Sequence, residues 1–192
     1  MLPKLVLASS SPRREMLLKQ MGLDFTIVPS KINEKEFDYL GPLNMVNELA
    51  RAKAEDVARL VEDTIVIAAD TIVVYKGEKL GKPVDTDDAF EMLKRLQGDN
   101  HTVITGIAVI STNDFKTIVD NEKTLVYMRN LDDSEIKNYI ASGEAMDKAG
   151  SYGIQGLGGI LVNRIDGSYF NVVGLPIHKL ALILKGLAVN VL

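Results

Sequence analysis

Apolar runs typical of buried strands alternate along most of the chain with amphipathic segments typical of helices. The pattern predicts strands at residues 5–8, 24–29, 64–75, 102–111, 116–128, 160–165 and 168–173. It predicts helices at residues 12–22, 43–62, 86–96 and 132–143, and a last apolar helix that Pro176 opens. Strand–helix units and hairpins both occur, so we expect an α/β fold in which helices flank a mixed, twisted sheet.

Polar residues mark several of these boundaries. Thr86 is the expected N-cap of its helix. Asp132 and Glu135 have the spacing of a capping box, in which each side chain satisfies the other residue's backbone N–H. Asp166-Gly167 is a typical turn pair, and it predicts a hairpin between the two strand-like runs on either side.

Length and composition are ordinary for a globular protein: 192 residues, 46% of them hydrophobic and 25% charged, can bury a full core. The net charge of −4 argues against a nucleic-acid partner, which would usually require a basic face. The lack of cysteine excludes disulfides and thiolate chemistry, and two histidines are too few for a His-rich metal cluster. We expect a cytoplasmic protein with no membrane partner, because there is no signal-peptide core and no apolar run approaches about 18 residues.

The first strand–helix unit carries an unusual set of polar residues. Three serines at residues 9–11 precede Pro12, which suits a first helical turn, and Arg13 and Arg14 follow. A helix start presents unpaired N–H groups and the positive end of the dipole, so two successive arginines there indicate an anion that offsets their repulsion. The favoured interpretation is a phosphate site to which Ser9 contributes. The alternative is a serine N-cap followed by solvated arginines.

Asp70 lies inside the apolar run of residues 65–74. An ionised carboxylate buried there costs several kcal/mol unless a metal, a cation or solvent meets it. The alternative is that the strand ends at Ala69 and that Asp70 begins a turn, but the renewed apolar run from Ile72 weakens it. Catalysis or metal binding is therefore favoured for Asp70.

Lys53 is a second charge in an apolar setting. At about 100° per residue it falls within one helical stripe of apolar side chains. These are Val46, Leu49, Ala50, Val57 and Val61. A lysine there either snorkels to the edge of the core or projects a cation into a cleft, and both interpretations stay open.

Residues 77–83 resemble a phosphate-binding Walker A loop at first sight. The glycine spacing is one residue short, however, and Pro83 stands where that motif needs a serine or threonine. Lys82 could still reach a phosphate from this loop, although the segment alone is a generic turn.

Residues 147–156 are rich in glycine around Tyr152 and Gln155. Their spacing does not match the dinucleotide fingerprint. Glycines would let the backbone approach a flat ligand, and the Gln155 amide offers both a donor and an acceptor to the edge of a base. The alternative is a glycine-rich bend. His101 and His178 are assigned no catalytic role, because neither has an apparent acid–base partner in the sequence.

Seven segments, in order over nearly the whole chain, match the motifs of one known family. They are Ser9-Ser-Ser-Pro-Arg-Arg-Glu-Met-Leu-Leu18, Ala50-Arg-Ala-Lys53-Ala54, Ala69-Asp-Thr-Ile-Val73, Gly81-Lys-Pro83, His101-Thr-Val-Ile-Thr-Gly106, Asp147-Lys-Ala-Gly-Ser-Tyr-Gly-Ile-Gln-Gly156 and Asn171-Val-Val-Gly-Leu-Pro176. On these segments the chain resembles the Maf family of nucleoside triphosphate pyrophosphatases.

The resemblance implies a hydrolase of nucleotide metabolism that cleaves a nucleoside triphosphate between its α- and β-phosphates, with a divalent cation, Mg²⁺ or Mn²⁺, as cofactor. It also implies one family domain over residues 1–192, with two lobes around a central cleft as in the inosine-triphosphate pyrophosphatases, and a homodimer. Arg13, Thr71 and Gln155 match the branch linked to dTTP and UTP, not the branch linked to 7-methyl-GTP. Ala145-Met146 departs from the family, where a proline usually follows the Gly-Glu pair; this bears on the rigidity of the loop and not on the chemistry.

The resemblance and the residues converge on one candidate site. Asp70 is the expected catalytic residue, either as a metal ligand or as the base that deprotonates a water. Glu34 is the expected second metal ligand, because Mg²⁺ prefers oxygen ligands, although Glu34 also fits an ordinary charged loop. The expected substrate-binding residues are Ser9, Arg13, Arg14, Lys53, Thr71, Lys82 and Gln155.

Two other functions remain possible from sequence. A nucleotide-binding regulator of septum formation, with no enzymatic activity, would use the same phosphate site but would not need Asp70 in it, so the buried carboxylate favours an enzyme. A pyrophosphatase that removes modified nucleotides would share the chemistry and differ only in its preferred base. A purely structural role has the least support.

Overall fold

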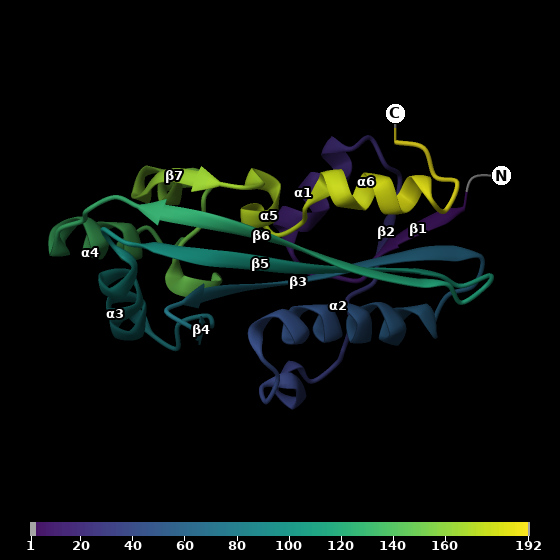
Figure 1. Cartoon of the computed structure of the whole chain (residues 1–192), viewed down its shortest axis with the longest axis horizontal. Coiled ribbons are helices and arrows are strands. Elements are labelled where there is room, and N and C mark those ends of the chain that lie inside the picture. Colours follow the sequence, from purple (N-terminus) through teal and green to yellow (C-terminus); the bar gives the residue numbers. More distant parts are fainter. Residues whose placement is uncertain (1–2, 192) are drawn as a thin grey trace. The chain divides into compact units, whose positions relative to one another are not determined.

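A computed structural model of the chain describes residues 3–191, which divide into two compact units (Figure 1). The first unit comprises the chain up to Asp70, Thr105–Glu122, and the chain from Gly174 onwards. The second comprises Thr71–Ile104 and Lys123–Val173. Three long strands contribute residues to both units: β3 (Thr64–Tyr75), β5 (Asn100–Ser111) and β6 (Thr117–Met128). The two lobes that the family resemblance implies are thus present as two units.

The sheet of the first unit follows the order β2-β1-β3-β5-β6. The strand β1 (Lys4–Leu7) pairs in parallel with both β2 (Thr26–Ile27) and β3, with Leu7 opposite Ile67. Every residue of β3 from its start to Asp70 is buried. A parallel strand that is covered on both faces needs such a continuous run of apolar residues. The apolar run at residues 64–75 therefore predicted β3 with its observed bounds.

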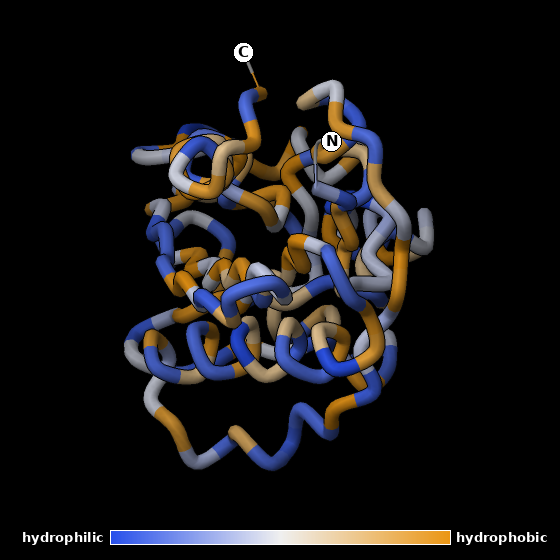
Figure 2. The backbone as a smooth tube through the Cα atoms, turned by 90° about the vertical axis from the view of Figure 1, so that its right-hand side faces the viewer, coloured by the Kyte–Doolittle hydropathy of each residue, from blue (hydrophilic) through white to orange (hydrophobic). Residues whose placement is uncertain are grey.

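Four helices accompany this sheet: α1 (Pro12–Gln20), the 3₁₀ helix η1 (Glu34–Phe37), α2 (Pro42–Ala58) and α6 (Ile177–Lys185). Figure 1 shows α2 on one face of the strands and α1 with α6 on the other. Gly106 lets α2 approach closely, because a Cβ there would lie 2.3 Å from the backbone oxygen of Val46. Hydrophobic and hydrophilic residues interleave along the backbone, as amphipathic helices require (Figure 2).

The second unit adds two short strands, β4 (Glu78–Leu80) antiparallel to β3 and β7 (Val162–Asp166) antiparallel to β6. Its helices are α3 (Thr86–Leu96), α4 (Asp133–Ala141), η2 (Ala149–Ser151), η3 (Gly156–Leu161) and α5 (Tyr169–Val173). Their core includes Leu93, Leu96, Val126, Ile136 and Tyr152. None of the helices within residues 3–191 combines the length and the apolar character needed to cross a bilayer.

Several predicted boundaries are confirmed and several others are wrong. The bounds of β3 and α3 and the capping box of Asp132 and Glu135 are as predicted. The N-cap of α3 is Asp85 and not Thr86, because the Asp85 carboxylate accepts the hydrogen bond from the Asp88 N–H at 2.8 Å.

The hairpin predicted around Asp166-Gly167 does not form. The strand β7 pairs with β6 instead, and residues 169–173 form the helix α5. Thr124 on β6 accepts the Ser168 N–H at 3.0 Å, and the buried Asn171 amide donates to the Thr124 hydroxyl at 2.8 Å. These side-chain bonds to β6 hold residues 168–171 close to that strand in a helical turn.

Other differences concern length. The helix α2 ends at Ala58, four residues earlier than predicted, since its last turn tightens when the Leu60 N–H bonds to the Val57 carbonyl. The strand β2 keeps only two residues of the predicted 24–29, and the loop predicted at 77–83 contains β4.

Candidate active site

The loop between β1 and α1 has the predicted open helix start. Ser11 occupies the N-cap position with an extended backbone, but its side chain makes no capping hydrogen bond, and Pro12 fills the first helical turn. Ser9 is buried, and its hydroxyl oxygen accepts hydrogen bonds from the Ser11 N–H at 3.1 Å and from Arg14 Nη1 at 3.3 Å. Ser11 is thus the N-cap residue of α1 without a side-chain cap, and the positive end of the helix dipole at this start suits an anion.

Arg14 is fixed at both ends of its guanidinium. Besides the contact with Ser9, its Nε donates to the Gly174 carbonyl at 2.9 Å, which joins α1 to the segment that leads into α6. Desolvation lowers the pKa of Arg14, the negative charge of Asp70 opposes that shift, and the charge of Arg13 adds to it. Arg14 is thus a half-buried cation and not a solvated one.

Strand alternation and helix periodicity together explain why Asp70 meets Lys53. On β3, Val66 and Ala68 pack against the apolar stripe of α2, and Asp70 is the next residue on the same face of the strand. On α2, Lys53 lies in the stripe that contains Ala50 and Ala54. The alternation of β3 and the periodicity of α2 therefore bring the Asp70 carboxylate and the Lys53 ammonium to the same face of β3.

Lys53 binds two carboxylates. Its Nζ lies 2.6 Å from Asp70 Oδ1 and 2.6 Å from Glu34 Oε1, the latter from η1. Lys53 and Asp70 are only 9% and 6% exposed, whereas Glu34 is largely in solvent. Desolvation raises the pKa of Asp70, and the charges of Lys53 and Arg14 limit the rise. Lys53 is therefore paired and does not snorkel.

The first unit thus brings together the predicted residues Ser9, Arg13, Arg14, Glu34, Lys53 and Asp70. Cations, a buried carboxylate and an uncapped helix start form one polar site there, which suits a phosphorylated ligand.

The remaining predicted residues belong to the second unit. Thr71 follows Asp70 on β3 and is half-buried, Lys82 is exposed after β4, and Gln155 is half-buried before η3. The Gly150 N–H donates to the Gly81 carbonyl at 3.0 Å, so the loop of Lys82 lies beside the glycine-rich segment.

A family model described as "Maf-like protein" matches residues 4–187. The chain belongs to the Maf family.

Relatives in this family match the chain over nearly its full length. A protein of Thermoanaerobacter pseudethanolicus is 54% identical over 183 residues, 95% of each chain. One of Acetivibrio thermocellus is 52% identical over 196 residues, 98% of each chain. One of Syntrophomonas wolfei is 50% identical over 186 residues, 97% of this chain and 98% of the relative. All three proteins are named dTTP/UTP pyrophosphatase.

Similar solved structures include the Ham1 protein of Staphylococcus aureus, with 19% identity and a TM-score of 0.45 over 65% of this chain and 71% of that one. A nucleoside-triphosphatase / dITP/XTP pyrophosphatase of Mycobacterium abscessus is 12% identical to this chain. Its TM-score is 0.39, and the match covers 65% of this chain and 72% of that one. The family assignment rests on the sequence matches and not on these likenesses.

The donor set of this Maf family site fits a divalent cation with few protein ligands. Asp70 and Glu34 both direct an oxygen at the Lys53 ammonium, so two carboxylates already converge on one positive charge. Within residues 3–191 no group of three or more His, Cys, Asp or Glu side chains could hold a metal. Mg²⁺ commonly takes one or two carboxylates and completes its shell with water and phosphate oxygens, which suits this pair.

His101 and Tyr152 form a buried pair that the sequence did not reveal. His101 Nε2 lies 2.6 Å from the Tyr152 hydroxyl, and the two rings meet edge to face. Burial lowers the pKa of His101 to about 4, so the imidazole is neutral. The pair ties the start of β5 to the glycine-rich segment.

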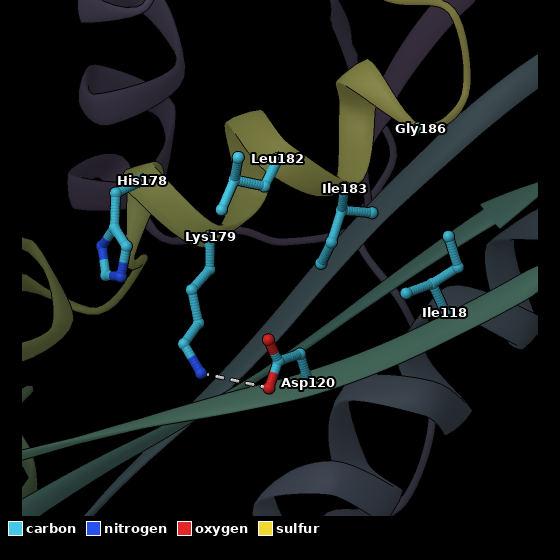
Figure 3. A pocket seen from close by; sticks show the side chains of 7 residues that line it. All are labelled: Ile118, Asp120, His178, Lys179, Leu182, Ile183 and Gly186. Carbon is cyan, nitrogen blue, oxygen red and sulfur yellow. Dashed lines mark hydrogen bonds and ion pairs between the residues drawn. The ribbon is translucent and has the colours of Figure 1, made fainter.

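A separate hollow of about 390 Å³ lies between β6 and α6 (Figure 3). Ile118, Leu182 and Ile183 line it, and Lys179 Nζ reaches Asp120 Oδ1 at 3.1 Å. No predicted site residue lines this hollow, so it is distinct from the polar site.

Proposed function

We propose that this Maf family protein hydrolyses dTTP and UTP between the α- and β-phosphates and releases pyrophosphate and a nucleoside monophosphate. The observation that carries the proposal is the buried Asp70, paired with Lys53, which also binds Glu34, in the same site as Arg14 and the start of α1. The names of the relatives support both the reaction and the substrates.

The cations and the helix start would bind the triphosphate. Arg13 and Arg14 supply charge-assisted hydrogen bonds to phosphate oxygens, and the start of α1, which has no side-chain cap, adds the positive end of a helix dipole. A protein of net charge −4 needs such local cations to attract a polyanion. Ser9 holds Arg14 in place through the 3.3 Å hydrogen bond. Lys82 is the proposed further phosphate contact in the second unit.

Asp70 is the group best suited to take a proton. Its pKa is raised by desolvation, which brings a carboxylate closer to the basicity needed to deprotonate a water. The water oxygen would bond to the α-phosphorus, its proton would pass to Asp70, and the bond from that phosphorus to the bridging oxygen would break. Lys53 keeps the Asp70 carboxylate ionised and oriented before the reaction.

We propose Mg²⁺ or Mn²⁺ as the cofactor, with Asp70 and Glu34 as the residues that would hold it. When bound, the ion would neutralise charge on the pyrophosphate leaving group. Asp70 as a metal ligand and Asp70 as a base are both compatible with its position.

We assign base selectivity to the second unit, through Thr71 and Gln155, together with Arg13 of the first. Gln155 carries the one amide in the glycine-rich segment, and an amide can pair with both a carbonyl and an imino group of a pyrimidine edge. Modified pyrimidine nucleotides would be read by the same amide.

The testing experiment measures pyrophosphate release from a panel of canonical and modified nucleoside triphosphates, each with Mg²⁺ or Mn²⁺. We expect turnover of dTTP and UTP that Asp70→Asn abolishes with the fold intact. Asp24→Asn is the matched control, because Asp24 is an exposed aspartate in the same unit. Nucleotide binding without any pyrophosphate release would favour the non-enzymatic regulator over the enzyme. Near-normal turnover by Asp70→Asn would show that Asp70 is not the catalytic residue.

The resemblance also supports a homodimer in the cytoplasm with no nucleic-acid partner. The side chain of Leu182 on α6 is an apolar group that is 69% exposed and available to a second copy. Sedimentation velocity of the wild type and of Leu182→Lys tests the dimer; a monomeric wild type would contradict it.

A further inference from the structure

The glycine-rich segment closes on itself around Gln155. A Cβ at Gly158 would lie 2.0 Å from the Gly153 carbonyl oxygen, so the backbones at the two ends of residues 153–158 are in direct contact. Gly156 has a positive φ of 62°, which glycine adopts without strain. Gln155 lies between these points, and the orientation of its amide therefore depends on what holds the loop.

Glu144, just after α4, holds the second half of this loop. Its Oε1 accepts the Leu157 N–H at 3.1 Å and its Oε2 accepts the Gly158 N–H at 3.3 Å. A Cβ at Gly156 would lie 2.6 Å from Glu144 Oε1, so the glycine is what permits the carboxylate to come this close. Each carboxylate oxygen thus satisfies one of two consecutive backbone donors.

Because Glu144 accepts these backbone hydrogen bonds, the Gln155 side chain is not needed as a cap for η3. Gln155 occupies the N-cap position of η3, yet its side chain makes no capping hydrogen bond. Glu144 supplies the acceptors that an N-cap residue would otherwise provide. The amide of Gln155 makes no hydrogen bond to another residue of the described chain, so its donor and acceptor remain available to a ligand.

Tyr139 on α4 holds the first half of the loop. Its hydroxyl accepts the Gly153 N–H at 3.2 Å, and the ring is buried. Tyr139 and Glu144 thus hold the loop on both sides of Gln155, and all of these residues lie in the second unit.

We infer that Glu144 is a positioning residue that sets the Gln155 amide for recognition of a pyrimidine base. This rests on the proposed function, in which Gln155 reads the base. Glu144 contacts the backbone of the loop and acts on the nucleotide only through Gln155.

The test is a double-mutant cycle between Glu144→Ala and Gln155→Ala, measured as kcat and KM for dTTP, UTP and dGTP. Glu144→Ala should raise KM for dTTP and UTP about tenfold, leave kcat within about twofold and leave dGTP unchanged. In the Gln155→Ala background, Glu144→Ala should change KM less than about twofold, because the interaction it positions is already gone.

Two further variants separate positioning from general damage. Glu144→Gln keeps one oxygen acceptor and should recover part of the affinity, whereas an equal loss in both Glu144 variants would contradict the inference. Glu91→Ala removes an exposed carboxylate from α3 of the same unit and should match the wild type. Additive effects in the cycle, or a fall in kcat for all three nucleotides, would overturn the positioning role.

Amide hydrogen exchange tests the geometry independently of turnover. Leu157 and Gly158 should exchange at least about tenfold faster in Glu144→Ala, while the amides of α3 keep their protection. A wild type that hydrolyses dTTP together with unchanged exchange overturns this inference alone. A wild type that neither binds nor hydrolyses dTTP overturns the proposed function as well.

Discussion

Lys53 Nζ lies 2.6 Å from Asp70 Oδ1 in the interior of the first unit, and both side chains are almost fully buried. A buried ion pair of this kind is weak evidence for stability, because the loss of water around two charges offsets most of their attraction. The presence of this ion pair on an otherwise apolar face of β3 is better explained by a role in the reaction than by a contribution to stability.

Lys53→Met should destabilise the protein and stop turnover. The variant leaves Asp70 buried beside Arg14 alone, so we expect a loss of about 3 kcal/mol in the free energy of unfolding at pH 7, measured by urea denaturation. Lys35→Met, at an exposed lysine of η1, should stay within about 0.5 kcal/mol of the wild type. Equal stabilities for the two variants would show that Asp70 is not charged in the folded state.

Arg14→Lys should weaken nucleotide binding although it keeps the charge. Arg14 bonds simultaneously to Gly174 and Ser9 through different nitrogens, and a lysine ammonium cannot reproduce that fork. We expect KM for dTTP to rise about tenfold. Arg51→Lys, at an exposed arginine paired with Glu48, is the control. A KM equal to that of the wild type would argue against a fixed guanidinium in substrate binding.

His101 should make stability depend on pH. Burial lowers the pKa of His101 from 6.5 to about 4, so between these values the unfolded chain binds a proton that the folded chain does not. The stability due to neutral His101 is full above pH 6.5 and is lost as the pH falls through about 4. The loss should be about 3 kcal/mol, at about 1.4 kcal/mol per pH unit.

Urea denaturation at pH 7 and pH 4.5 measures this contribution. His101→Gln should flatten the difference between the two pH values, whereas His178→Gln should keep it, because His178 is half exposed on α6. A pH dependence that survives in His101→Gln would assign it to other groups.

Gly106→Ala should be strongly destabilising. The new Cβ would meet the Val46 backbone oxygen at 2.3 Å, and neither β5 nor α2 can give way as a flexible side chain would. We expect a loss of more than about 2 kcal/mol by denaturant titration. Gly41→Ala, where a Cβ would have no neighbour within 4 Å, should cost less than about 1 kcal/mol.

Sequence patterns predicted an element correctly where the residues of that element alone determine its structure. The apolar run of β3 and the capping box of α4 are of this kind. The helix α5 could not be predicted, because it forms through Ser168 and Asn171 bonds to Thr124, 44 and 47 residues earlier in the chain. The turn pair before it is equally compatible with a hairpin.

The same distinction applies to the site. Lys53 and Asp70 are visible in the sequence because a charge interrupts an apolar pattern, and the structure pairs them. Glu144 gives no such signal. A glutamate after a glycine at a helix end looks like any solvated charge, and only the fold of residues 153–158 reveals its two backbone partners.

The alternation of β3 constrains which length changes this protein can tolerate. Val66, Ala68 and Asp70 share one face because successive strand residues point to opposite sides. Inserting or deleting a single residue upstream of Asp70 within the strand would turn the carboxylate away from Lys53. The side chain of an adjacent strand residue would then point toward Lys53 instead. Natural indels should therefore be confined to connections such as residues 112–116, and the spacing between residue 64 and Asp70 should be invariant among functional relatives.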